Sequence, residues 1–199
     1  MPKEGKARVL TSSEFKRLIA IAKDANYSHR NVALIYCSFG LGLRAKEIAS
    51  LKISDFFDEE LNILEEVNLT RSMTKGEKQR HIYINHPKVI EALQNHIKTM
   101  KEKQSINFKY HSPLFISKFK SRFTPDGMQK WFKKLFDKAG IKAASSHSGR
   151  RTFITRLIEQ GADIKAVSLL AGHSSITTTA GYVDSNPDRL KRISNLAVF

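Results

Sequence analysis

The sequence of 199 residues contains one cysteine, Cys37, and no apolar run of the roughly 18 residues that a membrane-spanning helix needs. A single thiol excludes an intrachain disulfide framework, and its place in an apolar stretch indicates a reducing interior. The first residues, Met1 to Gly5, have no apolar centre and do not resemble a secretory signal. These absences predict a cytoplasmic protein without membrane contact.

Acidic residues are scarce. The chain has 19 Asp and Glu against 34 Lys and Arg, a net charge of +15. The surplus is uneven, because residues 98–138 hold eleven basic and three acidic residues, whereas residues 53–66 hold six acidic residues and no basic one. Solubility is the plainer explanation of surplus lysine, but a pI near 10 favours a polyanionic partner such as DNA. Residues 98–138 are then expected to contact its backbone.

Helical signals dominate the pattern of apolar and capping residues. Thr11 and Glu14 form a capping box, and Pro87 and Thr124-Pro125 suit helix starts. Further helices are expected near 29–39, from residue 44, and at 147–160, 163–171 and 175–182. Residues 62–67 and 80–84 read as strands around a hairpin turn at 74–78, and residues 114–116 as a short strand. The predicted fold class is mainly α with a small antiparallel β-sheet (α+β).

The length fits a single domain with one core, residues 1–199. Residues 1–10 are expected to be a flexible segment, and residues 187–199 a C-terminal helix. That helix packs either on its own core or against a neighbouring subunit, and the sequence leaves both possibilities open.

Several residues of the last third suit the chemistry of a phosphodiester. His147 and Arg150 are spaced to share one face at a helix start, where free N–H groups favour an anion. His173 follows a glycine turn, nine residues before Tyr182. An unperturbed tyrosine phenol has a pKa of about 10, so its attack at neutral pH requires nearby cations or a base. Each residue taken singly has an ordinary structural explanation.

Two basic residues come from the first half of the chain. Arg44 follows the flexible run at 40–42, and its planar fork can bind two phosphate oxygens together. Lys75 lies at the predicted hairpin tip, where an ammonium could protonate a departing sugar oxygen. A solvated turn lysine is the plainer reading of Lys75.

The order of these residues resembles the tyrosine recombinase (phage integrase) family from about Thr11 to Asp184. The matching positions are, in chain order, Gly42-Leu43-Arg44-Ala45-Lys46-Glu47-Ile48, Thr74-Lys75-Gly76, His147-x-x-Arg150, Leu170-Ala171-Gly172-His173 and Tyr182. The resemblance implies the catalytic-domain fold of that family and a prokaryotic, viral or mobile-element origin. It also implies an enzyme that cuts and rejoins double-stranded DNA through a 3′-phosphotyrosyl link.

The resemblance also implies a role for each matching residue. Tyr182 would be the nucleophile, and Arg44 and Arg150 would hold the phosphate oxygens. His173 would hydrogen-bond the phosphate, His147 would assist proton transfer, and Lys75 would protonate the leaving 5′-oxygen. Glu47 matches an acidic position that supports the site from behind. Because the phosphotyrosine keeps the bond energy, neither a metal nor another cofactor is expected.

The sequence departs from the family pattern in two places. The motif H-x-L-R-H reads here His147-Ser148-Gly149-Arg150-Arg151, so Gly149 replaces an apolar packing residue and Arg151 a histidine. Most members also carry an N-terminal helical domain, for which ten residues before Thr11 leave no room. The chain is therefore expected to be a catalytic domain alone or a small recombinase.

The favoured function is site-specific recombination of DNA: integration, excision, inversion or resolution. A type IB topoisomerase would share the chemistry, and a non-catalytic DNA-binding regulator would share the scaffold. A basic structural or ribonucleoprotein domain with accidental motifs is the remaining alternative. The recombinase reading implies a tetramer on paired DNA sites and allows a monomer free in solution.

Overall fold

The computed structural model describes residues 7–70, 79–103, 108–183, 191, 194 and 195. Lys75 with its hairpin turn, and all but three residues of the predicted helix at 187–199, lie outside these ranges.

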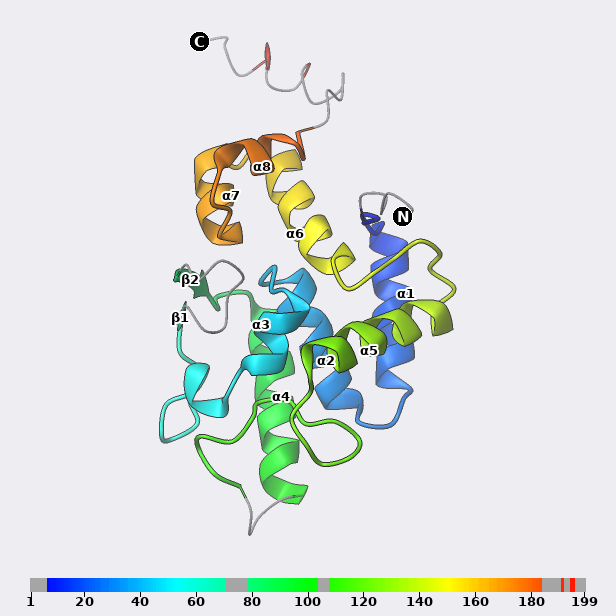
Figure 1. Cartoon of the computed structure of the whole chain (residues 1–199), viewed down its shortest axis with the longest axis vertical. Helices are drawn as coiled ribbons and strands as arrows, with labels where there is room; N and C mark the ends of the chain where they lie inside the picture. The colour runs from blue at the N-terminus through cyan, green and yellow to red at the C-terminus, as the bar shows by residue number, and fades with distance from the viewer. Residues whose placement is uncertain (1–6, 71–78, 104–107, 184–190, 192–193, 196–199) are drawn as a thin grey trace.

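The described chain is mainly helical with one small sheet, as the sequence predicts (Figure 1). In chain order the elements are α1 Ser12–Lys23, α2 Ser28–Phe39, α3 Ala45–Ser50, the 3-10 turn η1 Ile53–Asp55, β1 Glu66–Leu69, β2 Arg80–Tyr83, α4 Pro87–Lys103, α5 Pro125–Lys138, α6 Ser148–Glu159, α7 Ile164–Ala171 and α8 Ile176–Ala180. The two strands are antiparallel, with Glu66 opposite Tyr83 and Leu69 opposite Arg80. No helix of the described part is both long and apolar enough to cross a bilayer.

Local sequence signals explain most helix ends. The Thr11 side chain accepts the Glu14 N–H while the Glu14 carboxylate accepts the Thr11 N–H, which is the predicted capping box. Thr124 caps α5 ahead of Pro125, where its side chain accepts the Gly127 N–H. Gly172 ends α7 at φ +60°, a left-handed conformation that favours glycine.

Two of the strand predictions are wrong in detail. The first strand begins at Glu66 rather than residue 62, because residues 58–62 form a turn closed by Asp58 and Asn62. Residues 114–116 form no strand. Ile116 instead bridges Arg122 across a tight turn, and Pro113 bridges Lys52. Leu114 and Phe115 are both buried, and the sequence pattern of such a short buried apolar run cannot be told from that of a strand.

Two apolar clusters support the elements. The larger one lies among α1 to α5 and the sheet, and its fully buried side chains include Phe56, Phe57, Phe115, Phe132 and Phe136. The smaller one joins α6 and α7 through Ile154, Ile158, Val167 and Ala171, with Tyr182 packed against it, and α8 packs on α7. Helix α6 packs against α2, and α7 lies beside β2 (Figure 1). Segments more than a hundred residues apart therefore meet between the clusters.

Candidate active site

Arg44 and Glu47 form a tight pair at the start of α3. Glu47 reaches back so that its Oε2 accepts the Arg44 backbone N–H at 2.7 Å and its Oε1 accepts Arg44 Nη1 at 2.8 Å. The Glu47 side chain is fully buried, whereas that of Arg44 is one-fifth exposed. Helix geometry thus fixes the carboxylate and leaves the guanidinium at the edge of the solvent.

Arg150 reaches the same place from α6. The side chain is buried; its Nη1 donates to the Gly42 carbonyl at 2.9 Å and its Nη2 donates to the Ala171 carbonyl. Burial lowers the pKa of Arg150 to about 9, and the positive charges of Arg44 and Arg80 act in the same direction while Glu47 opposes the shift. The mutual repulsion shows that these guanidiniums share one neighbourhood.

Arg80 is the residue of this cluster that the sequence reading missed. It is buried at the start of β2, where Nη2 meets Glu47 Oε2 at 2.7 Å and Nη1 donates to the Leu170 carbonyl at 2.5 Å. Strand alternation could have indicated that Arg80 points inward, because Arg80 and Ile82 are the buried residues of β2 and alternate with the exposed His81 and Tyr83. A charged residue at an inward strand position requires a buried partner.

His173 and Tyr182 close the other side. His173 follows the α7 cap, its Nδ1 hydrogen-bonds the buried Thr179 hydroxyl at 2.8 Å, and its ring stacks on that of Tyr182 with centroids 5.9 Å apart. The Arg151 guanidinium lies over the Tyr182 ring at 5.4 Å. Burial, followed by the charges of Arg150, Arg44 and Arg80, lowers the pKa of His173 to about 4. The imidazole is therefore neutral at pH 7.

The structure thus brings together four of the six expected residues: Arg44, Arg150, His173 and Tyr182. His147 is the exposed N-cap residue of α6, and among the described residues its imidazole takes no part in the hydrogen-bonded cluster. Lys75 lies outside the described residues. Among the described residues Arg44 and Arg80 share the Glu47 carboxylate and Arg150 donates only to backbone carbonyls, so two of the three guanidinium charges have no carboxylate partner there. That surplus of positive charge suits an anion such as a phosphodiester.

Close packing against α2 explains why residue 149 is a glycine. A Cβ at this position would come within 2.1 Å of Ser38 Oγ and 2.9 Å of Phe39 Cδ2. Because α2 fills the space that a larger residue would occupy, α6 lies directly on α2 and Arg150 is carried to the Gly42 carbonyl. The departure from the family motif is therefore matched by close packing.

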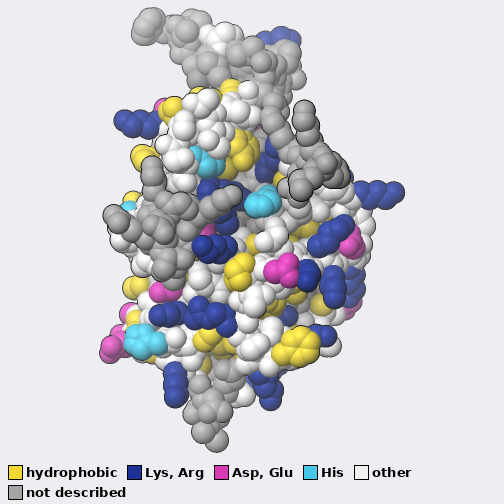
Figure 2. Space-filling model, viewed as in Figure 1, with side chains coloured by type: hydrophobic (Ala, Val, Ile, Leu, Met, Phe, Trp, Pro, Cys, Tyr) yellow, Lys and Arg dark blue, Asp and Glu magenta, His cyan; other side chains and the backbone are white. Residues whose placement is uncertain are grey.

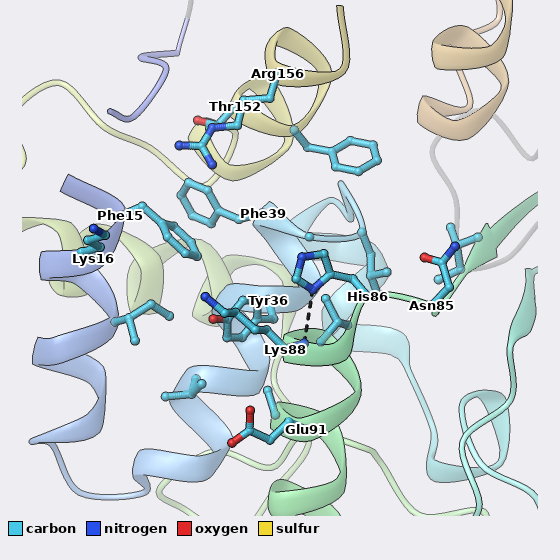
Figure 3. A pocket seen from close by; sticks show the side chains of 18 of the residues that line it. Phe15, Lys16, Tyr36, Phe39, Asn85, His86, Lys88, Glu91, Thr152 and Arg156 are labelled. Carbon is cyan, nitrogen blue, oxygen red and sulfur yellow. Dashed lines mark hydrogen bonds between the residues drawn. The ribbon is translucent and has the colours of Figure 1, made fainter. Parts of the chain in front are cut away.

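A wide groove of about 1270 Å³ lies elsewhere, among α1, α2, α4 and α6 (Figure 3). Phe15, Tyr36 and Phe39 line it, together with basic side chains such as Lys88 and Arg156. Arg44, Arg80 and Arg150 do not line this groove, so the groove and the candidate active site are different places. In the described part of the chain no three His, Cys, Asp or Glu side chains gather as metal ligands. Basic side chains are spread widely over the face in Figure 2.

Comparisons with known proteins identify the family of the chain. Residues 8–189 match the phage integrase family. The chain is 30% identical over 184 residues to tyrosine recombinase XerD of Oceanobacillus iheyensis, and 32% identical over 185 residues to tyrosine recombinase XerA of Pyrococcus furiosus. Each match covers 92% of this chain and 59% of the relative. The chain belongs to the phage integrase family, and it spans about three fifths of the length of these two relatives.

Solved structures show the same fold. A crystal structure of XerA recombinase superposes with a TM-score of 0.71 at 27% identity, covering 96% of this chain and 65% of the other. The Tn1549 transposon integrase in complex with transposon right end DNA gives a TM-score of 0.76 at 23% identity, covering all of this chain and 69% of that one. The expected tyrosine recombinase catalytic-domain fold is therefore confirmed.

Proposed function

We propose that this chain carries out the strand cleavage and rejoining of a site-specific DNA recombinase. The observation that carries the proposal is that Arg44 and Arg80 pair with Glu47 while Arg150 lies in the same neighbourhood, with the ring of Tyr182 stacked on that of His173. A phosphodiester brings one negative charge, and attack by a phenolate adds a second. Two guanidinium charges without a carboxylate partner among the described residues match that developing charge and stabilise it more than the ground state.

The reaction is balanced within the chain and the DNA. The Tyr182 oxygen forms a bond to phosphorus, the bond from phosphorus to the 5′-oxygen breaks, and a 3′-phosphotyrosyl link and a 5′-hydroxyl result. In the reverse step a 5′-hydroxyl of the same or another strand displaces the tyrosine. The number of phosphoester bonds is unchanged, so neither step consumes an external energy source.

The remaining residues take parts that follow from their chemistry and from the family resemblance. Arg44 and Arg150 hold the non-bridging oxygens, and the neutral His173 donates a hydrogen bond to one of them. The exposed His147, one helical turn before Arg150, receives the tyrosine proton. Lys75 delivers a proton to the departing 5′-oxygen.

Strand exchange between paired sites is favoured over a topoisomerase or a non-catalytic regulator, because both curated relatives described above are named tyrosine recombinases. The tyrosine and the two arginines that attack requires are present as well. We extend the proposal to a tetramer on two duplexes and to action in the cytoplasm, where bacterial DNA lies. Sedimentation with and without the cleavable duplex tests the tetramer.

Covalent capture tests the chemistry and identifies the DNA site in the same experiment. Duplexes with a randomised centre and a nick that releases the cut end are incubated with the protein, and adducts that survive denaturation are sequenced. The wild-type chain is expected to yield adducts on a common sequence. Tyr182→Phe should yield none while still binding the recovered duplex. An adduct in the phenylalanine variant would remove Tyr182 from its role, and no wild-type adduct would refute the proposal.

A further inference from the structure

Arg80 stands behind the cluster rather than at its open side. Only 5% of its surface is exposed, and its guanidinium donates to Glu47 Oε2 and to the Leu170 carbonyl. Its Nε is buried without a hydrogen-bond partner among the described residues. A buried guanidinium that leaves one donor unsatisfied carries a cost of desolvation, so its other contacts must stabilise it.

The two oxygens of Glu47 are divided between two arginine side chains. Oε1 accepts Arg44 Nη1 at 2.8 Å, and Oε2 accepts Arg80 Nη2 at 2.7 Å and the Arg44 backbone N–H at 2.7 Å. No other side-chain nitrogen of Arg44 donates to a described residue. A carboxylate facing a lone guanidinium would bind it through two parallel N–H bonds, which is the strongest arrangement for such a pair.

We propose that Arg80 is a positioning residue that occupies Glu47 Oε2, so that Arg44 is held through one nitrogen only and keeps the rest of its fork for the DNA phosphate. Without Arg80, the carboxylate and Arg44 pair in the two-bond arrangement, and the donors that face the phosphate turn inward. This inference deepens the proposed function and rests on it for the identity of the anion.

Two neighbours fix the path of the Arg80 side chain. The Leu170 carbonyl at the end of α7 accepts Nη1, and Gly172 leaves room for the stem, because a Cβ there would lie 2.4 Å from Arg80 Cδ. Burial alone would raise the pKa of Glu47, but Arg80 and then Arg44 bring it below its ordinary value. The carboxylate is therefore charged while both arginines are present, and Arg44 is the charged partner that stays hydrogen-bonded to it when Arg80 is lost.

The decisive measurement is single-turnover cleavage of the duplex recovered by covalent capture. Arg80→Met keeps the length of the side chain without its charge, and we expect a rate loss of about 100-fold, typical of a displaced catalytic group. Adding Glu47→Gln to this variant should restore the rate at least about tenfold, because an amide cannot bind the fork of Arg44 through two oxygens. Arg80→Lys, which can still reach Oε2, should lie between Arg80→Met and wild type.

Arg30→Met is the matched control for losing a buried arginine. Arg30 is 8% exposed, and it donates to Asn31 and the Ile116 carbonyl rather than to the cluster around Glu47. This variant should lose thermal stability and keep its cleavage rate per folded molecule. A double variant of Arg80 and Glu47 that cleaves no faster than Arg80→Met would overturn the inference, and so would an Arg80→Met variant as fast as wild type.

A second readout is independent of DNA cleavage. The Arg44 Nε–H signal in ¹⁵N-arginine spectra, assigned through its loss in Arg44→Lys, is titrated with inorganic phosphate in each variant. It should shift in Arg80→Met and Arg80→Lys before phosphate is added, and in Arg80→Met it should need several-fold more phosphate to respond. An unmoved signal refutes the role of Arg80 even if the protein cuts DNA. A shifted signal with no wild-type adduct supports the role of Arg80 and refutes the reaction.

Discussion

The two apolar clusters of this protein differ in how they hold their elements together. The large cluster of α1 to α5 packs aromatic rings on one another, as Phe39, Phe132 and Phe136 do. The small cluster of α6 and α7 has, among the described residues, four buried apolar side chains, and the end of α7 is held by guanidiniums that donate to the Leu170 and Ala171 carbonyls. Stability therefore resides mainly in the first region, and the position of Tyr182 depends on polar contacts in the second.

Removing a ring from the large cluster should have the largest effect. Phe132→Ala deletes a side chain that is 1% exposed and leaves a cavity, which costs about 3–5 kcal/mol. Urea unfolding should show a lower midpoint for the whole chain. Val167→Ala in the small cluster should cost less and mainly increase hydrogen exchange in α7 and α8. Equal losses in both variants would contradict the comparison.

The contact between α6 and α2 links the regions and should be next in size. Gly149→Leu restores the residue of the family motif, but its Cβ meets Ser38 Oγ, and overpacking of this kind costs about 1–3 kcal/mol. Cleavage should fall as well, since Arg150 moves with α6. Chemical denaturation measures the loss, and Ser38→Gly added to the variant should recover part of it. A stable, active Gly149→Leu variant would contradict the prediction and show that α2 can shift to accommodate a larger side chain.

The hydroxyl of Thr179 should matter more for the site than for the fold. Thr179→Val keeps the shape of this fully buried residue but removes its hydrogen bond to His173, a loss of about 1 kcal/mol. We expect cleavage to slow about tenfold, because the imidazole loses the contact that orients its ring. Thr179→Ser should cleave like wild type. The rates of both variants on the recovered duplex decide the matter.

The smallest expected effect is a difference between two histidines, His96 and His173, in how their pKa values respond to phosphate. Both pKa values are about 4. Burial is the first cause for His96 in the large cluster and for His173, but the arginines of the site also act on His173. Both pKa values lie below the unfolded value of 6.5, so the stability that they contribute is complete above about pH 6.5 and is lost as the pH falls towards 4. In NMR titrations, inorganic phosphate should raise the pKa of His173 and leave that of His96 unchanged. An equal response would mean that no anion binds beside the guanidiniums.

The helices were predictable from the sequence because their signals are local. Capping residues, the proline at the start of α4 and the glycine after α7 each act within one turn, so the start of α1 at Thr11 and the end of α7 at Gly172 followed from neighbours alone. The segment at 114–116 was misread because the backbone pairings around it, Pro113 with Lys52 and Ile116 with Arg122, are isolated bridges rather than a continuous strand ladder.

The sequence by itself determined which residues were candidates for the chemistry, since the order of Arg44, His147, Arg150, His173 and Tyr182 can be read without a fold. The tertiary structure decided which of them meet and what surrounds them. Arg80 lies in the candidate site because β2 packs against both Glu47 and the end of α7. The need for a glycine at position 149 is explained only by its contact with α2. Contacts between segments far apart in the chain depend on shape and burial, which no local pattern contains.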